Sequence, residues 1–160
     1  MAKEKSPDAE SDLVLVITRT FDAPRERVFD AWLDPDSIGG WIGTRDIRAE
    51  TLELTPHVGG RYRIHMRRAD GSSGPVVSGT YREIVRPERL VFTWMWEPGH
   101  PVAAGQDTLV TVTFSERNGR TEMQLKHELF SSKEVRDRHK EGWTVSFEKM
   151  AELLASASAR

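Results

Sequence analysis

A run of residues with aromatics at alternate positions limits most strongly what this chain can fold into. Residues 88–97 read ERLVFTWMWE, and one side of the period-two pattern carries Leu90, Phe92, Trp94 and Trp96. This alternation predicts a β-strand, because successive side chains of a strand point to opposite faces. Aromatic side chains bury more apolar area than other residues do. The face must therefore be covered by a helix, a second sheet or a ligand.

The composition of the chain is that of a soluble globular domain. Its 160 residues are 38% hydrophobic and 30% charged, which suits one domain with its own core. The net charge of −2 argues against a general attraction to nucleic acid or to anionic membranes. The lack of cysteine excludes disulfides, thiolate metal sites and cysteine nucleophiles. No apolar run reaches the length of a membrane span and no signal-peptide core is present, so we expect a cytoplasmic protein.

The order of the predicted elements is strand, helix, six strands and a long helix, after a disordered polar tail over residues 1–12. We expect strands at 13–20, 47–54, 61–68, 76–85, 90–97, 108–116 and 121–129. We expect helices at 24–33 and 132–154, and a short helical turn at 36–41. Strands joined by tight turns, such as the Asn118-Gly119 hairpin, indicate an antiparallel meander. Residues 13–155 should therefore form a single domain.

The last predicted helix carries one apolar stripe, which consists of Val135, His139, Trp143, Phe147, Met150 and Leu154. Their spacings of three and four residues place them on one face of a helix. Ser131 and Glu134 have the spacing of a capping box at its start. Gly142 lies inside this helix, where it costs about 1 kcal/mol relative to alanine. A close approach to the sheet, a cavity mouth beside the helix, or neutral drift would each explain it.

Five segments of the chain, in this order, resemble one known family. They are Phe21–Gly43, Val58–Arg63, Gly79–Trp94, Val112–Glu128 and His139–Trp143. The chain is similar here to bacterial proteins that resemble the C-terminal domain of the activator of heat-shock protein 90 ATPase. That family belongs to the START and pollen-allergen-like (SRPBCC) superfamily. The resemblance implies an α+β helix-grip fold, in which a curved antiparallel sheet wraps around a long C-terminal helix, with a short helical insert after the first strand.

Three functions follow from this resemblance. The leading hypothesis is a non-enzymatic protein that binds a small hydrophobic molecule, aromatic or lipid-like, between sheet and helix. The second is a polyketide-cyclase-like or hydrolase-like enzyme that uses a cavity histidine with a tyrosine or glutamate. The third is a chaperone-interacting module with a role in the stress response. The eukaryotic activators carry an additional N-terminal domain that contacts the chaperone, and we expect this chain to lack it. Both a monomer and a homodimer remain open.

The predicted cavity lining combines apolar and aromatic side chains with a few polar groups, as ligand sites do. The strands would supply Tyr62, Ile64, Met66, Tyr81, Phe92, Trp94, Trp96, Val110, Val112, Phe114, Met123, Leu125 and His127. The long helix would supply His139, Trp143, Phe147 and Met150. The sequence leaves open the alternative that most of these residues fill an ordinary dry core.

Two histidines are candidates for a specific role in this cavity. His127 shares its strand face with Met123 and Leu125, so we expect it to point inward, and His139 lies on the helix stripe. Either residue would orient a ligand oxygen or act as a general base, and a structural histidine is the alternative. The histidine spacing does not suit a metal site, and we expect neither a metal nor a cofactor.

Two further segments are interpreted by their position and composition. Residues 39–43 and 98–106 are rich in glycine or proline and are expected to flank the cavity mouth, with a plain surface loop as the alternative for the second. One face of the strand at 61–68 carries Arg61, Arg63, His65 and Arg67. We interpret this basic row as a solvated outer face, balanced by acidic neighbours.

Overall fold

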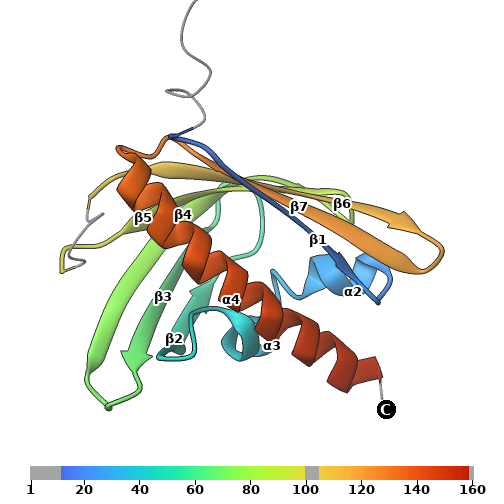
Figure 1. Cartoon of the computed structure of the whole chain (residues 1–160), viewed down its shortest axis with the longest axis horizontal. Coiled ribbons are helices and arrows are strands. Elements are labelled where there is room, and N and C mark those ends of the chain that lie inside the picture. The colour runs from blue at the N-terminus through green and yellow to red at the C-terminus, as the bar shows by residue number, and fades with distance from the viewer. Residues whose placement is uncertain (1–11, 100–104, 159–160) are drawn as a thin grey trace, which may run out of the picture.

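The computed structural model describes residues 12–99 and 105–158, and in them an antiparallel sheet curls around one long helix (Figure 1). The seven strands lie in the order β1 (Leu15–Phe21), β7 (Arg120–Glu128), β6 (Thr108–Arg117), β5 (Arg89–Trp96), β4 (Ser73–Val85), β3 (Arg61–Arg68) and β2 (Ile47–Leu54). All neighbours pair antiparallel. The α+β helix-grip fold expected from the sequence is therefore confirmed.

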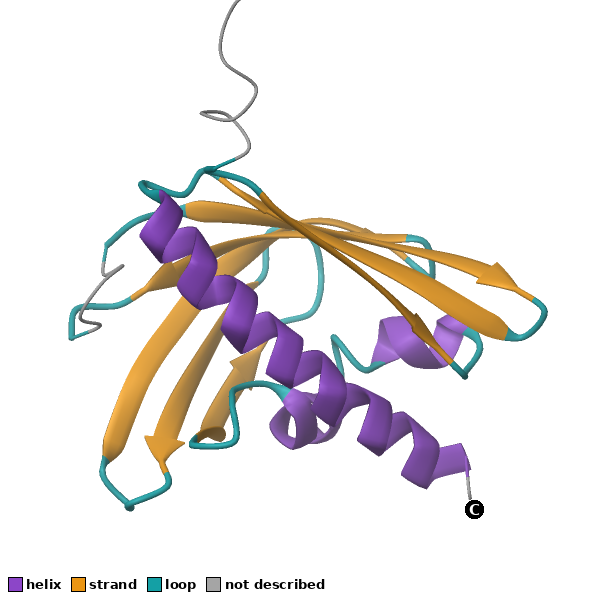
Figure 2. Ribbon diagram, viewed as in Figure 1, coloured by secondary structure: helices purple, strands orange, loops and turns teal. Residues whose placement is uncertain are grey.

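Three helices accompany the sheet (Figure 2). The long helix α4 (Lys133–Ser158) crosses the concave side of the sheet, and α2 (Arg25–Asp30) and α3 (Pro35–Trp41) follow β1. The first helix is shorter than the predicted 24–33, because a new helix starts at Pro35, where Asp34 Oδ1 accepts a hydrogen bond from Asp36 N at 3.3 Å. None of the described helices is both long enough and apolar enough to cross a bilayer.

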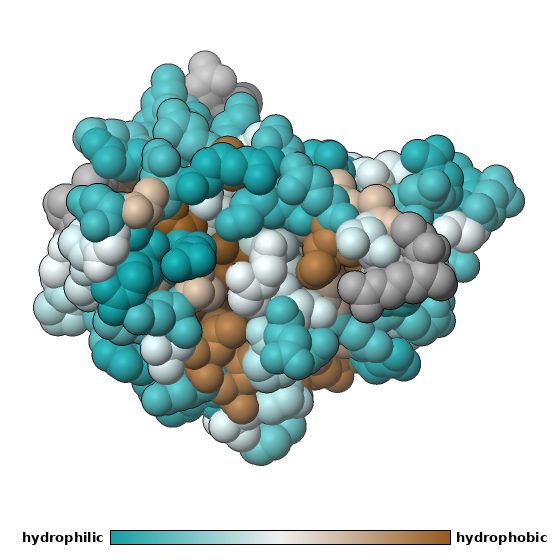
Figure 3. Space-filling model, turned by 90° about the horizontal axis from the view of Figure 1, so that it is seen from below, coloured by the Kyte–Doolittle hydropathy of each residue, from teal (hydrophilic) through white to brown (hydrophobic). Residues whose placement is uncertain are grey.

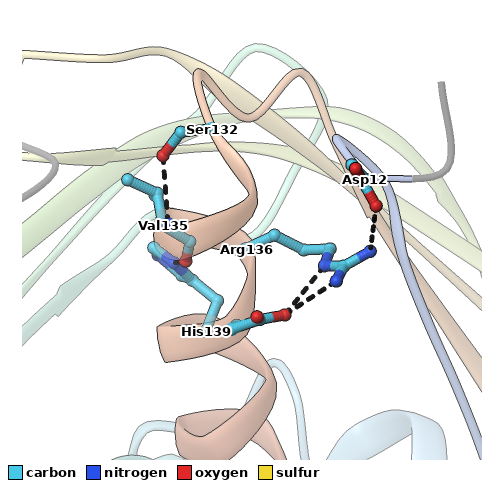
Figure 4. A network of polar contacts seen from close by, with 6 residues as sticks. Asp12, Ser132, Val135, Arg136 and His139 are labelled. Atoms are coloured by element: carbon cyan, nitrogen blue, oxygen red, sulfur yellow. Dashed lines mark hydrogen bonds and ion pairs between the residues drawn. The ribbon is translucent and has the colours of Figure 1, made fainter. Parts of the chain in front are cut away.

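The start of α4 corrects one prediction made from the sequence (Figure 4). The capping side chain is that of Ser132, whose Oγ accepts a hydrogen bond from Val135 N at 3.2 Å, and not that of Ser131. The capping-box spacing favoured Ser131, because Glu134 lies three residues after it, whereas Val135 lies three residues after Ser132. Asp12, which the sequence assigned to the tail, lies 3.9 Å from the guanidinium of Arg136 in this first turn. The rest of the predicted tail lies outside the described residues.

The core forms where the aromatic face of β5 meets the apolar stripe of α4. Leu90, Phe92 and Trp94 are buried, as are all stripe residues except His139, which is half-buried. Trp94 and Trp143 make the central contact, with ring centroids 4.9 Å apart. Periodicity predicted both of these faces. As expected, the long helix lies on the concave side of the sheet.

The basic row on β3 is the solvated outer face that the sequence indicated. Arg63 pairs with Glu97 at 2.9 Å, and Arg67 pairs with Glu50 at 2.6 Å. Both pairs are partly exposed to solvent, where an ion pair contributes little to stability. This face of the sheet therefore carries balanced charges and lies away from the helix.

Candidate functional site

A cavity of about 320 Å³ lies between the first half of α4 and the strands β2 to β5. Its apolar wall contains the buried residues Ile42, Met66, Trp94, Val135 and Trp143, together with Ile47, Pro75 and Trp96. Polar or small groups complete the lining, and these are Gly43, Thr44, Arg68, Arg138, His139, Glu141, Gly142 and Ser146. Seen from below the sheet, apolar residues reach the surface among hydrophilic ones (Figure 3). Its volume is at the lower end of the range for small-molecule sites, which is roughly 300–1,000 Å³.

The structure divides the residues predicted from the sequence into three groups. Those that line the cavity are Met66, Trp94, Trp96, His139 and Trp143. A second cavity of only about 20 Å³, which Trp94 also borders, is lined by Tyr62, Ile64, Tyr81 and Phe92. The remainder pack in the core away from both cavities, namely Val110, Val112, Phe114, Met123, Leu125, His127, Phe147 and Met150. Periodicity identified inward side chains, but only some inward side chains face a void.

The sequence also missed part of the lining. Thr44 comes from the connection between α3 and β2, and Arg68 comes from the end of β3. Ser146 was not assigned to the cavity, and a cavity mouth was one of three explanations for Gly142. Both share a helix face with His139 and Trp143 at spacings of three and four residues. That spacing was the signal that could have found them.

One of the two segments expected at the cavity mouth contributes to its lining. Gly43 lies in the wall, and two features require glycine there. Its φ is +98°, and the Cβ of any other residue would lie 2.3 Å from the carbonyl oxygen of Ile47. Gly39 and Gly40 are not part of the lining. The second segment falls partly on residues 100–104, outside the described residues, and its described residues do not line the cavity.

The wall formed by residues 42–44 is fastened to α4 by side chains of the helix. Ser146 Oγ accepts a hydrogen bond from Gly43 N at 3.1 Å and donates one to Gly43 O at 2.7 Å. Lys149 Nζ donates to the carbonyl oxygens of Ile42 and Thr44, both at 3.3 Å. Burial, and then the charge of Arg45, lower the pKa of Lys149. These bonds fix one wall of the cavity relative to the helix.

His127 points inward and is completely buried, as its strand parity predicted. Trp143 Nε1 donates a hydrogen bond to His127 Nδ1 at 3.1 Å. Because an indole nitrogen only donates, Nδ1 is the acceptor and His127 Nε2 carries the proton. Nε2 lies 2.7 Å from Thr108 Oγ1, which in turn donates to Trp94 O at 2.7 Å. Both ring nitrogens are thus engaged within the core, and His127 has neither left for a ligand.

The surroundings of His127 keep its ring neutral. Burial lowers the pKa of His127 well below its usual value, and the neighbouring His139 lowers it further. The two rings lie edge to face, with centroids 5.0 Å apart. Protonation would also replace the acceptor at Nδ1 with a second donor facing the Trp143 N–H. His127 is therefore a structural histidine in its neutral form.

His139 is held in a similar way at the wall of the cavity. Trp96 Nε1 donates to His139 Nε2 at 2.9 Å, so that His139 Nδ1 donates to Val135 O one turn earlier, at 2.8 Å (Figure 4). The lone pair of the neutral ring is thus directed at Trp96. The pKa values of Tyr62 and Tyr81 are both raised, chiefly by burial, so their phenols remain protonated at neutral pH.

Two buried indole N–H groups, those of Trp32 and Trp94, have no acceptor among residues 12–99 and 105–158. Both tryptophans border the smaller cavity, and Trp94 also borders the larger one. A buried donor without an acceptor costs free energy.

Among the residues that the structure describes, no three His, Asp or Glu side chains gather into a group that could hold a metal ion.

The fold is that of helix-grip proteins, a class that commonly binds hydrophobic ligands. A family model described as "Activator of Hsp90 ATPase homolog 1-like protein" matches residues 22–155. The chain therefore belongs to this family, as the resemblance of its sequence motifs predicted. No curated protein matches it in sequence.

Several solved structures share the fold. A solution structure of a protein from Arthrobacter aurescens is 25% identical, with a TM-score of 0.80, and the match covers 96% of this chain and 90% of that one. The AHSA1 protein from Silicibacter pomeroyi is 26% identical, with a TM-score of 0.76 and coverage of 90% and 99%. A protein from Chromobacterium violaceum is 24% identical, with a TM-score of 0.78 and coverage of 88% and 95%.

Proposed function

We propose that this chain binds a small hydrophobic molecule in the cavity between α4 and strands β2 to β5. The observation that carries this proposal is the lining, in which Trp94 and Trp143 form an apolar wall around about 320 Å³ of space. Aromatic and aliphatic walls with a few polar groups are typical of ligand sites. Met66, which is buried in the same wall, adapts its shape to irregular ligands.

The contacts of the two histidines favour binding over catalysis. A general base needs a lone pair that reaches the substrate. The lone pair of neutral His127 is taken by Trp143 Nε1, and that of neutral His139 by Trp96 Nε1. The protonated phenols of Tyr62 and Tyr81 offer no base in their place. These contacts count against the cyclase-like or hydrolase-like alternative, which depended on a cavity histidine as the base.

Gly142 provides the sharpest test, because it lines the cavity and a Cβ at this position would meet no atom within 4 Å apart from its own stretch of helix. This contact-free position favours the explanation by a cavity mouth over that by close approach to the sheet. We expect Gly142→Leu to fill part of the cavity and to weaken binding of the neutral probe 2-naphthamide by at least about tenfold, or roughly 1.4 kcal/mol. Isothermal titration calorimetry would measure it.

Gly142→Ala is the matched control, since it adds one methyl group at the same position. We expect it to raise the free energy of unfolding by about 1 kcal/mol, through helix propensity, and to leave binding nearly unchanged. Native mass spectrometry of the wild-type chain, looking for a co-purifying small molecule, complements the titration. Equal affinity of wild type and Gly142→Leu for the probe would rule out this cavity as the binding site.

A chaperone is the second partner we propose, because the family is named for an activator of the Hsp90 ATPase. The measurement is the ATPase rate of a purified Hsp90-type chaperone with and without a saturating amount of this chain. An unchanged rate would remove this candidate and leave the ligand-binding proposal intact.

The cytoplasmic location and the choice between monomer and homodimer stay predictions.

A further inference from the structure

The charged residues of the cavity are unevenly distributed. Arg68, Arg138 and Glu141 are exposed, and they are the charged groups of the lining, whereas the wall behind them is apolar. Arg68 ends β3 and Arg138 lies in the second turn of α4, so the two arginines approach from opposite walls. The solvent-facing end of the cavity therefore carries more positive than negative charge.

Neither arginine has its guanidinium in a hydrogen bond or ion pair with another described residue. Other arginines of the described chain, such as Arg45, Arg63 and Arg86, each pair with a carboxylate. Asp70, two residues from Arg68, instead accepts hydrogen bonds from Ser72 N at 2.9 Å and Ser72 Oγ at 2.6 Å. The donors of Arg68 and Arg138 thus remain available to a ligand.

We propose that the ligand of this cavity carries a carboxylate, which Arg68 and Arg138 bind at the mouth, on a compact apolar body that lies against Trp94 and Trp143. This inference rests on the proposed binding function. A guanidinium presents paired N–H donors that match the two oxygens of a carboxylate. The modest volume favours a body of one or two rings over a long acyl chain.

The test compares two probes of nearly the same shape, 2-naphthoate and the neutral 2-naphthamide, by isothermal titration calorimetry at low ionic strength. We expect the wild-type chain to bind the carboxylate about tenfold more tightly. Arg68→Gln and Arg138→Gln should each weaken carboxylate binding by about two- to fivefold, the effect of an exposed ion pair. Each change should affect amide binding less than carboxylate binding, and the double variant should lose most of the preference.

Two further variants check that the effect is local. Glu141→Gln removes the acidic group of the mouth and should strengthen carboxylate binding by about twofold. Arg120→Gln removes an exposed arginine of β7 that does not line the cavity, and it should change neither affinity. Added salt should weaken binding of the carboxylate and spare the amide.

The outcomes separate this inference from the proposed function. Equal affinity of the wild-type chain for both probes, or a preference that survives in the double variant, would overturn the carboxylate and leave the hydrophobic site standing. Failure of both probes to bind, or binding that Gly142→Leu does not weaken, would overturn the proposed function and this inference with it. Loss of the preference in the double variant, with amide binding largely retained, would support it.

Discussion

Replacing Trp143 by alanine should lower the free energy of unfolding by about 3–5 kcal/mol, the usual cost of removing a large buried aromatic. The side chain is 3% exposed, and its ring centroid lies 4.9 Å from that of Trp94 and 5.6 Å from that of Phe147. The same ring forms part of the cavity wall, so the variant should also lose affinity for 2-naphthamide. Urea unfolding at neutral pH measures the first effect, and titration of the folded variant measures the second.

Trp143→Phe separates packing from hydrogen bonding. It retains an aromatic ring in the wall but removes the N–H that His127 Nδ1 accepts. We expect a loss of about 1–3 kcal/mol, which is the cost of an unsatisfied buried acceptor. If Trp143→Ala and wild type unfolded at the same urea concentration, the burial of this residue and the position of α4 against the sheet would both be wrong.

Acidification should destabilise the protein through His127. In the unfolded chain a histidine takes up a proton near pH 6.5, whereas burial holds the pKa of folded His127 well below that value. The unfolded state therefore binds more protons than the folded state below about pH 6.5. This contribution to stability is fully present above about pH 7.5 and falls as the pH decreases through 6.5, by up to about 1.4 kcal/mol per pH unit.

His127→Gln is the matched variant for this prediction. A glutamine offers one acceptor for Trp143 and one donor for Thr108, and it does not titrate. The measurement is urea unfolding of both proteins at a series of pH values from 5 to 8. The stability of the wild type relative to the variant should be constant above about pH 7.5 and decline below pH 6.5. Parallel curves over the whole range would show that His127 does not carry this pH dependence.

The elements of the fold were predictable because each carries a regular pattern. The alternation around Trp94 predicted β5, and the spacing around Trp143 predicted α4. Both faces that form the core were therefore predictable, although the contact between them was not. The same argument predicted that His127 points inward. Local patterns of this kind report which side of an element faces the core, since they depend only on the repeat of the strand or helix.

The site was less predictable because its walls come from distant parts of the chain. Gly43 and Ser146, which hydrogen-bond to each other, lie 103 residues apart. The role of His127 likewise depends on Thr108 and Trp143, which reach it from other elements. Sequence periodicity identifies an inward residue, but it does not say whether that residue meets a packed neighbour or a void. The capping serine of α4 was predicted wrongly for a smaller reason: the spacing to Glu134 indicated Ser131, whereas the adjacent Ser132 accepts the hydrogen bond from Val135 N.

The two hydrogen bonds between Ser146 and Gly43 bear on how a molecule enters the cavity. They hold the connection between α3 and β2 rigidly against the long helix. This wall is therefore already ordered when a ligand arrives. Little of the binding free energy would then be spent on organising the protein, as for other preformed pockets. Selection among ligands would depend on how well their shape and charge fit a rigid wall. Their rate of entry would depend on the side chains at the mouth.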